Sequence, residues 1–137
     1  MATRRRGREA ALQLLYALEV TQTDVSAVLH TAWAQAMMAE ETRDFTMALV
    51  QGVLVHRDEI DGLIQEWSAH WSLERIALVE RSILRFAIYE LLYMPDIPPN
   101  VTINEAIEVA KKYGSGEAAA FINGILDRIK HEVVQQP

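Results

Sequence analysis

Apolar residues recur along the chain at helical spacing, and no stretch alternates in the way that predicts a strand. Ala11, Leu14, Leu15 and Leu18 follow the i, i+3, i+4, i+7 pattern that gathers side chains on one face of a helix. Similar stripes return after each polar interruption. The pattern predicts an all-α fold with about seven helices, near residues 5–20, 25–36, 41–55, 59–69, 73–93, 102–113 and 117–133. It leaves open whether residues 41–69 form one helix or two.

Local signals refine these boundaries. The segment 73–93 is apolar over more than one stripe, which is typical of a helix in the middle of a bundle. The prolines in 95–99 stop that helix, and the stretch 95–101 is the candidate hinge between two helical halves. Thr102 and Glu105 match a capping box at the start of the next helix, and Gly114 is expected to end it as a left-handed cap.

Length and composition favour one domain over residues 1–137, with a core that needs no covalent staple. Half of the 137 residues are hydrophobic and none is cysteine, so disulfides, thiol nucleophiles and thiolate metal sites are excluded. This usage fits a reducing cytoplasm. The apolar run at 10–18 contains Gln13 and is flanked by Glu9 and Glu19, so an amphipathic helix is favoured over a signal peptide. No apolar run approaches the roughly 20 residues of a membrane span.

The distribution of charge reverses near the start of the chain. Arg4, Arg5, Arg6 and Arg8 are 4 of the 13 basic residues. The other 129 residues carry 9 basic and 19 acidic side chains, a net charge of −10. Guanidinium groups suit phosphate because they are always charged and can donate two parallel hydrogen bonds. The arm could therefore bind RNA, bind an acidic protein, or be a solvated terminus; the acidic body argues against sequence-blind coating of nucleic acid.

The sequence carries no recognisable catalytic or cofactor-binding arrangement. Its four histidines show no paired metal-ligand spacing, and the segment 114–116 lacks the frame of a nucleophile elbow. A phosphate-binding glycine loop is also missing. We therefore expect a protein that is not an enzyme, with no cofactor and no metal.

Two further groups of residues are candidates for binding. Phe121 either packs in the core or forms a stacking platform for an unpaired base. The charged residues Glu80, Arg81 and Arg85 lie among apolar neighbours. Three alternatives stay open for them: an exposed stripe, an interface with a partner, or salt bridges inside the protein. Tyr16 lies beside the first apolar stripe, where its amphipathic ring suits a protein interface.

Four segments resemble one known family, in order and over nearly the whole chain. They are residues 4–16 (RRRGREAALQLLY), 79–91 (VERSILRFAIYEL), 103–114 (INEAIEVAKKYG) and 121–127 (FINGILD). All four are similar to segments of the NusB transcription antitermination factors. The resemblance implies an all-helical bundle of two packed subdomains. It also implies binding to the boxA element of nascent ribosomal RNA leader transcripts.

The same resemblance implies partners and site residues. The expected protein partner is the small-subunit ribosomal protein that acts as NusE, followed by other Nus factors and RNA polymerase; a homodimer is also possible, and no membrane is involved. By analogy, the RNA-binding residues are Arg4, Arg5, Arg6, Arg8, Phe121 and Glu117. The expected partner-binding residues are Tyr16, Glu80, Arg81 and Arg85.

Two other functions compete with this interpretation. One is the NusB-like RNA-binding domain that some ribosomal RNA cytosine methyltransferases carry before their catalytic part. The sequence to Pro137 shows no cofactor-binding βαβ pattern, which favours a free-standing factor. The other is a helical adaptor that binds only protein, and its complex with the ribosomal partner would not depend on RNA.

Overall fold

The computed structural model describes residues 2–21, 39–68 and 73–134, and within them it is all-helical with no strand. The α-helices are α1 (Ala2–Thr21), α3 (Glu40–Val55), α4 (Arg57–Trp67), α5 (Leu78–Tyr93), α6 (Pro99–Tyr113) and α7 (Ala118–Ile129). A 3₁₀ turn, η1 (Leu73–Arg75), precedes α5, and a π-helical turn, η2 (Lys130–Val134), follows α7. The all-α prediction is confirmed, whereas the helix predicted near 25–36 lies outside the described residues.

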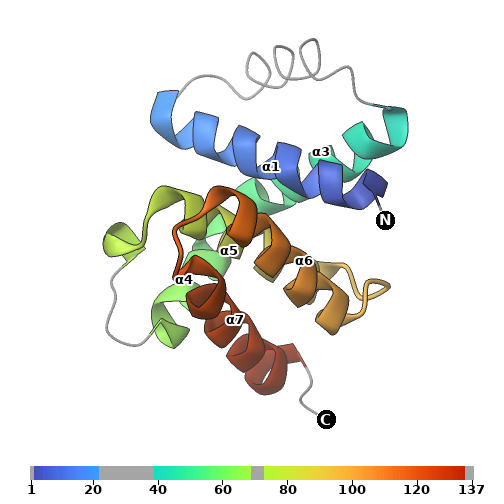
Figure 1. The fold of residues 1–137 in the computed structure, drawn as a ribbon. Coiled ribbons are helices and arrows are strands. Elements are labelled where there is room, and N and C mark those ends of the chain that lie inside the picture. Colours follow the sequence, from blue (N-terminus) through green and yellow to red (C-terminus); the bar gives the residue numbers. More distant parts are fainter. Residues whose placement is uncertain (1, 22–38, 69–72, 135–137) are drawn as a thin grey trace.

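Helix α5 is the centre of the bundle, as its apolar composition predicted. It contacts α1, α3, α4, α6 and α7. Its side chains at 83, 84, 86, 87 and 88 are completely buried. Helices α1 and α3 lie together on one side of α5, while α4, α6 and α7 pack on the other (Figure 1). None of the helices in the described part of the chain combines the length and apolar character that a membrane span needs.

The apolar stripe of α1 faces this core. Ala11, Leu14 and Leu15 are buried as predicted, Leu12 joins them, and Leu18 is half-buried. Burial of such a stripe is the main source of stability for a helix in a protein, because packing of an amphipathic face contributes more than helix propensity does. The stripe therefore fixes which face of α1 remains available to carry polar side chains.

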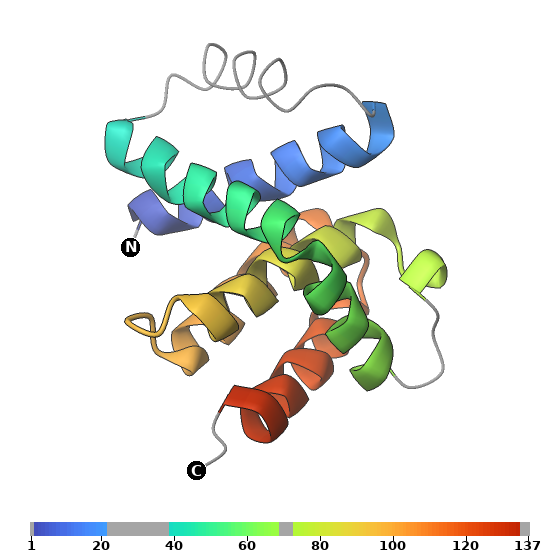
Figure 2. The same ribbon diagram turned by 180° about the vertical axis from the view of Figure 1, so that it is seen from behind.

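The segment 41–69 forms two helices, which answers the question that the sequence left open. The chain leaves helical geometry at His56, between α3 and α4, and Figure 2 shows the change of direction there. Glu40 and Glu41 occupy the first turn of α3, where negative charge is favourable beside the free amide groups.

Two predicted helix boundaries and one predicted cap conformation were wrong. The segment 73–93 is not continuous, because the extended backbone at Ala77 separates η1 from α5 and lets the buried Ile76 reach the core. Helix α6 begins at Pro99, whose fixed φ suits a first helical turn, so Thr102 and Glu105 lie inside the helix and form no capping box. Gly114 does end α6, but with extended backbone rather than a left-handed conformation.

Candidate nucleic-acid interface

The four arginines near the start of the chain lie within the first two turns of α1 and have different surroundings. Arg4, Arg5 and Arg6 are exposed. Arg8 is buried, with only 1% of its surface accessible. The expectation of four guanidinium groups at the surface was therefore wrong for Arg8, because its side chain lies three and seven residues before buried Ala11 and Leu15 and packs against α5.

Arg8 is held by a buried carboxylate from α5. Its Nε and Nη2 atoms donate to the two oxygens of Glu90 at 2.8 and 2.7 Å. Thr102 of α6 donates its hydroxyl proton to the same carboxylate at 3.0 Å. A buried charge is tolerated only when it is paired and its hydrogen-bonding capacity is used, and both conditions are met here. The pair joins α1 to α5 and α6.

The aromatic ring of Phe45, on α3, lies beside two of these arginines. The guanidinium carbons of Arg8 and Arg4 are 5.2 and 5.4 Å from its centroid, within the range of a cation–π interaction. Gly7 permits this close approach of α1 to α3, because a Cβ at that position would lie 2.7 Å from Phe45 Cδ2. The Gly7 carbonyl also accepts a hydrogen bond from the Thr46 hydroxyl at 3.2 Å.

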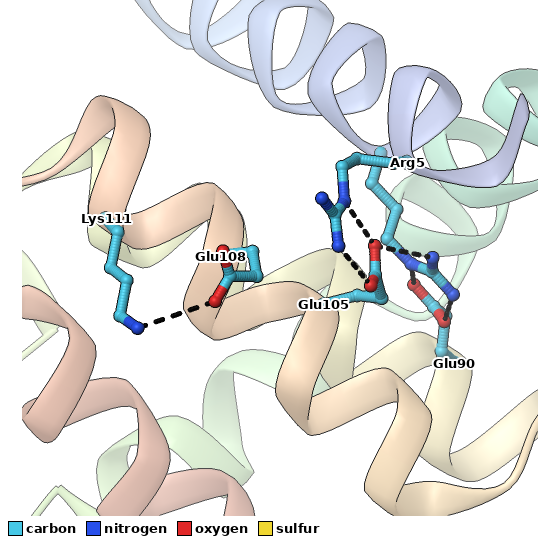
Figure 3. A network of polar contacts seen from close by, with 6 residues as sticks. Arg5, Glu90, Glu105, Glu108 and Lys111 are labelled. Carbon is cyan, nitrogen blue, oxygen red and sulfur yellow. Dashed lines mark hydrogen bonds and ion pairs between the residues drawn. The ribbon is translucent and has the colours of Figure 1, made fainter. Parts of the chain in front are cut away.

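Arg5 forms a second bidentate pair, this time at the surface. Its Nε and Nη2 donate to the oxygens of Glu105, on α6, at 2.9 and 2.7 Å (Figure 3). The hydrogen bond from Arg5 lowers the pKa of Glu105 below its ordinary value of 4.5 despite some opposing burial, and the charges of Arg5 and Arg8 lower it further. Glu105 therefore stays ionised and competes with any phosphate for Arg5.

Farther along the same two helices, a second ion pair has its charges exchanged, with the cation on α6 and the carboxylate on α1. Lys112 of α6 donates to both oxygens of Glu9, on α1, at 3.2 and 3.3 Å, and the Tyr113 hydroxyl donates to Glu9 at 3.1 Å. We call the contact made by Arg5, Glu9, Glu105 and Lys112 the α1–α6 seam. Sequence analysis missed Lys112, and the only local signal was the basic last turn of α6.

Three predicted site residues from two segments of the chain meet in one open depression. Phe121 and Glu117 line it together with Glu80, and Arg75 and Ser115 complete its polar rim. Its volume is about 250 Å³. Phe121 is half-buried, so its ring contacts the core and also faces this space. In this position Phe121 can pack against the core and still offer a ring face to an unpaired base, so the two roles considered from the sequence are compatible.

Of the three alternatives that the sequence left open for Glu80, Arg81 and Arg85, the structure does not show the exposed stripe. Glu80 is buried and accepts from the amide and hydroxyl of Ser115 at 3.4 and 3.3 Å. Arg81 is half-buried and donates to the Leu73 carbonyl at 3.3 Å. The internal salt bridge that the sequence also suggested is present for Arg85, because α5 turns this face toward other helices rather than toward solvent.

Arg85 is the centre of that internal network. It donates twice to Asp61, at 2.8 and 3.0 Å, and once to Glu19 at 2.8 Å. Arg57 is also paired with Glu19. Burial raises the pKa of Glu19, but the hydrogen bond from Arg85 and the charges of Arg57 and Arg85 outweigh this effect. The pKa of Glu19 therefore lies below its ordinary value of 4.5. These contacts tie the end of α1 to α4 and α5.

The predicted partner-binding residues do not form one surface. Tyr16 is 42% exposed on α1, whereas Arg85 is buried in its network and Glu80 opens only into the depression beside Phe121. Among the described residues, no group of three acidic or histidine side chains is arranged to hold a metal ion.

Comparison with known proteins decides the family. The model of the NusB family matches residues 5–131. The chain belongs to the NusB family. Two relatives carry the name transcription antitermination protein NusB. The one from Geobacter sulfurreducens is 52% identical, with 94% of each chain covered, and the one from Myxococcus xanthus is 47% identical, with 94% of this chain and 95% of the relative covered.

Solved NusB structures have the same fold. T. maritima NusB superposes with a TM-score of 0.89 at 38% identity, covering 96% of this chain and 92% of that one. A crystal structure of the antitermination factors NusB and NusE in complex with double-stranded RNA gives 0.87 at 25% identity, covering 96% and 98%. The resemblance seen in the sequence is confirmed, and the chain is a transcription antitermination factor rather than an enzyme.

The buried Arg8–Glu90 pair generates a stability prediction. Glu90→Gln removes the counter-charge and leaves the Arg8 guanidinium buried, so we expect it to lower the free energy of unfolding by about 3–5 kcal/mol. Urea unfolding at neutral pH measures this. The control is Glu108→Gln, which removes an exposed carboxylate that pairs with Lys111 and should change stability by about 0.5 kcal/mol or less. Equal stability of the two variants would contradict the prediction.

Proposed function

We propose that this chain binds the boxA element of nascent ribosomal RNA leader transcripts together with the ribosomal protein that acts as NusE. In that complex it joins other Nus factors and RNA polymerase. The observation that carries the proposal is the exposed row Arg4, Arg5 and Arg6, in a chain whose remaining residues are strongly acidic. A NusB relative is known in complex with NusE and RNA, which supports the same assignment here.

The charge distribution explains why a partner is needed. The basic groups of the arm lie at one end of α1, while the residues after Arg8 carry a net charge of −10. Such a surface attracts phosphate locally but repels it over most of the molecule. A basic ribosomal partner bound beside the arm would extend the positive surface, and the two proteins together would bind RNA better than either alone. Tyr16, the exposed member of the predicted partner set, is the proposed direct contact.

Selection of a particular unpaired sequence requires contacts to bases as well as phosphates. The depression beside Phe121 supplies an aromatic face, and Glu117 lies on its rim. Arg8, Arg81 and Arg85 are engaged inside the protein. We propose that they support the interface indirectly, by holding α1 and α5 in place.

Loss of Arg4 and Arg6, the two arginines of the arm for which the described residues show no ion pair, tests the arm. Arg4→Ala/Arg6→Ala should weaken boxA binding and make the slope of log K against log[salt] less steep by about 0.7 for each lost phosphate contact on a single strand. Binding is measured by fluorescence anisotropy with boxA and scrambled RNA, with the NusE-type partner present. The control variant, Arg43→Ala/Arg128→Ala, removes the same charge from exposed positions on α3 and α7. Identical slopes for the two double variants would reject the arm.

Replacement of Phe121 tests the stacking surface. Phe121→Ala should weaken boxA binding by about 1–3 kcal/mol without changing the salt slope, because stacking involves no charge. Phe121→Leu keeps apolar contact with the core and should show most of the same loss. If either variant folds and binds boxA as tightly as the unmodified protein, Phe121 is a core residue only.

A further inference from the structure

The α1–α6 seam holds two cations that are exposed and two carboxylates that are largely covered. The Arg5 and Lys112 side chains are 47% and 60% accessible, while those of Glu105 and Glu9 are 14% and 19% accessible. In each pair the carboxylate comes from the helix that faces the cation. The seam thus presents positive groups to solvent over a negative layer.

Each carboxylate has a second partner that stays in place if its cation moves away. Glu105 lies 3.7 Å from the Nη1 atom of buried Arg8. Glu9 accepts the hydroxyl proton of Tyr113. If Arg5 or Lys112 moved away, Glu105 would therefore still interact with Arg8, and Glu9 would still accept the hydrogen bond from Tyr113. This arrangement suits exchange of the cation between a protein carboxylate and an external anion.

We propose that the α1–α6 seam is a gated phosphate-binding track, in which RNA phosphates displace Glu105 from Arg5 and Glu9 from Lys112. The proposal rests on the RNA-binding function proposed above. It assigns phosphate binding to Lys112, and it makes Glu105 and Glu9 determinants of how tightly RNA binds.

The energetics favour exchange at the seam but not at Arg8. Exposed ion pairs contribute little to stability because water screens them, so opening the Arg5–Glu105 pair costs little. A phosphate offers Arg5 the same bidentate geometry as the carboxylate that it leaves. The Arg8–Glu90 pair is buried, and breaking it would leave two uncompensated charges in the core. We therefore expect Arg8 to keep its partner Glu90 while Arg5 exchanges Glu105 for a phosphate.

Matched acidic variants test the gate. Glu105→Gln removes the competitor of Arg5, whereas Glu108→Gln removes the same charge one turn away, where the carboxylate pairs with Lys111 (Figure 3). We expect Glu105→Gln to tighten boxA binding by about two- to fivefold, the equivalent of one exposed ion pair, and Glu108→Gln to have a smaller effect. The gain should vanish in an Arg5→Ala background. Binding by Glu105→Gln that is equal to or weaker than that of Glu108→Gln would overturn the gate.

Matched basic variants test the track. Lys112→Gln and Lys111→Gln remove neighbouring charges of similar accessibility, 60% and 62%, but only Lys112 lies in the seam. Lys112→Gln should reduce the salt slope by about 0.7, and Lys111→Gln should leave it unchanged. Equal slopes would remove Lys112 from the site.

A measurement on the unmodified protein covers the case in which Glu105→Gln fails to fold. The Nε–H resonances of Arg5 and Arg8 are followed by NMR as boxA RNA is added with the partner. The Arg5 signal should move and the Arg8 signal should stay, whereas an unmoved Arg5 signal overturns the gate. If the unmodified complex shows no preference for boxA, the proposed function fails as well. If boxA is preferred but the matched variants behave alike, only the gated track fails.

Discussion

The buried ion pair between Arg8 and Glu90 is the constraint on which the rest of the candidate site depends. A guanidinium group at this depth is acceptable only because two oxygens of one carboxylate accept its protons and Thr102 satisfies the carboxylate further. Together with the apolar stripe, this geometry fixes the rotation of α1 relative to α5 and α6. Once that rotation is fixed, Arg5 must face Glu105, and Arg4 and Arg6 must face solvent.

The sequence was sufficient for the parts of the structure that follow from local periodicity. The apolar stripe of α1 and the central position of α5 were predicted because spacing alone decides which face is buried. The fate of the individual arginines was not predictable in this way. Arg8 lies at the edge of the apolar stripe, three and seven residues before Ala11 and Leu15, but its carboxylate partner is 82 residues away. Only tertiary packing shows that its side chain is buried and paired.

The incorrect capping box has the same physical cause. Thr102 and Glu105 have the spacing that satisfies free amide groups at a helix start, but Pro99 begins α6 earlier and frees both side chains. They then bind Glu90 and Arg5 instead. Similarly, nothing local indicates that Glu80 of α5 shares a depression with Phe121 of α7, since each segment alone reads as an ordinary amphipathic helix. The candidate site is thus assembled from side chains whose contacts are made with residues far away in the sequence rather than with neighbouring residues of the same helix.

The most direct test of this view is amide hydrogen exchange along α1 in the unmodified protein and in Glu90→Gln. If the Arg8–Glu90 pair anchors the arm, the variant should exchange faster at residues 5–10 than the unmodified protein. Protection at 14–18, where Leu14, Leu15 and Leu18 pack on the core, should fall only as far as global stability falls. A uniform loss of protection along α1, or no change near Arg8, would contradict the anchoring role of this pair.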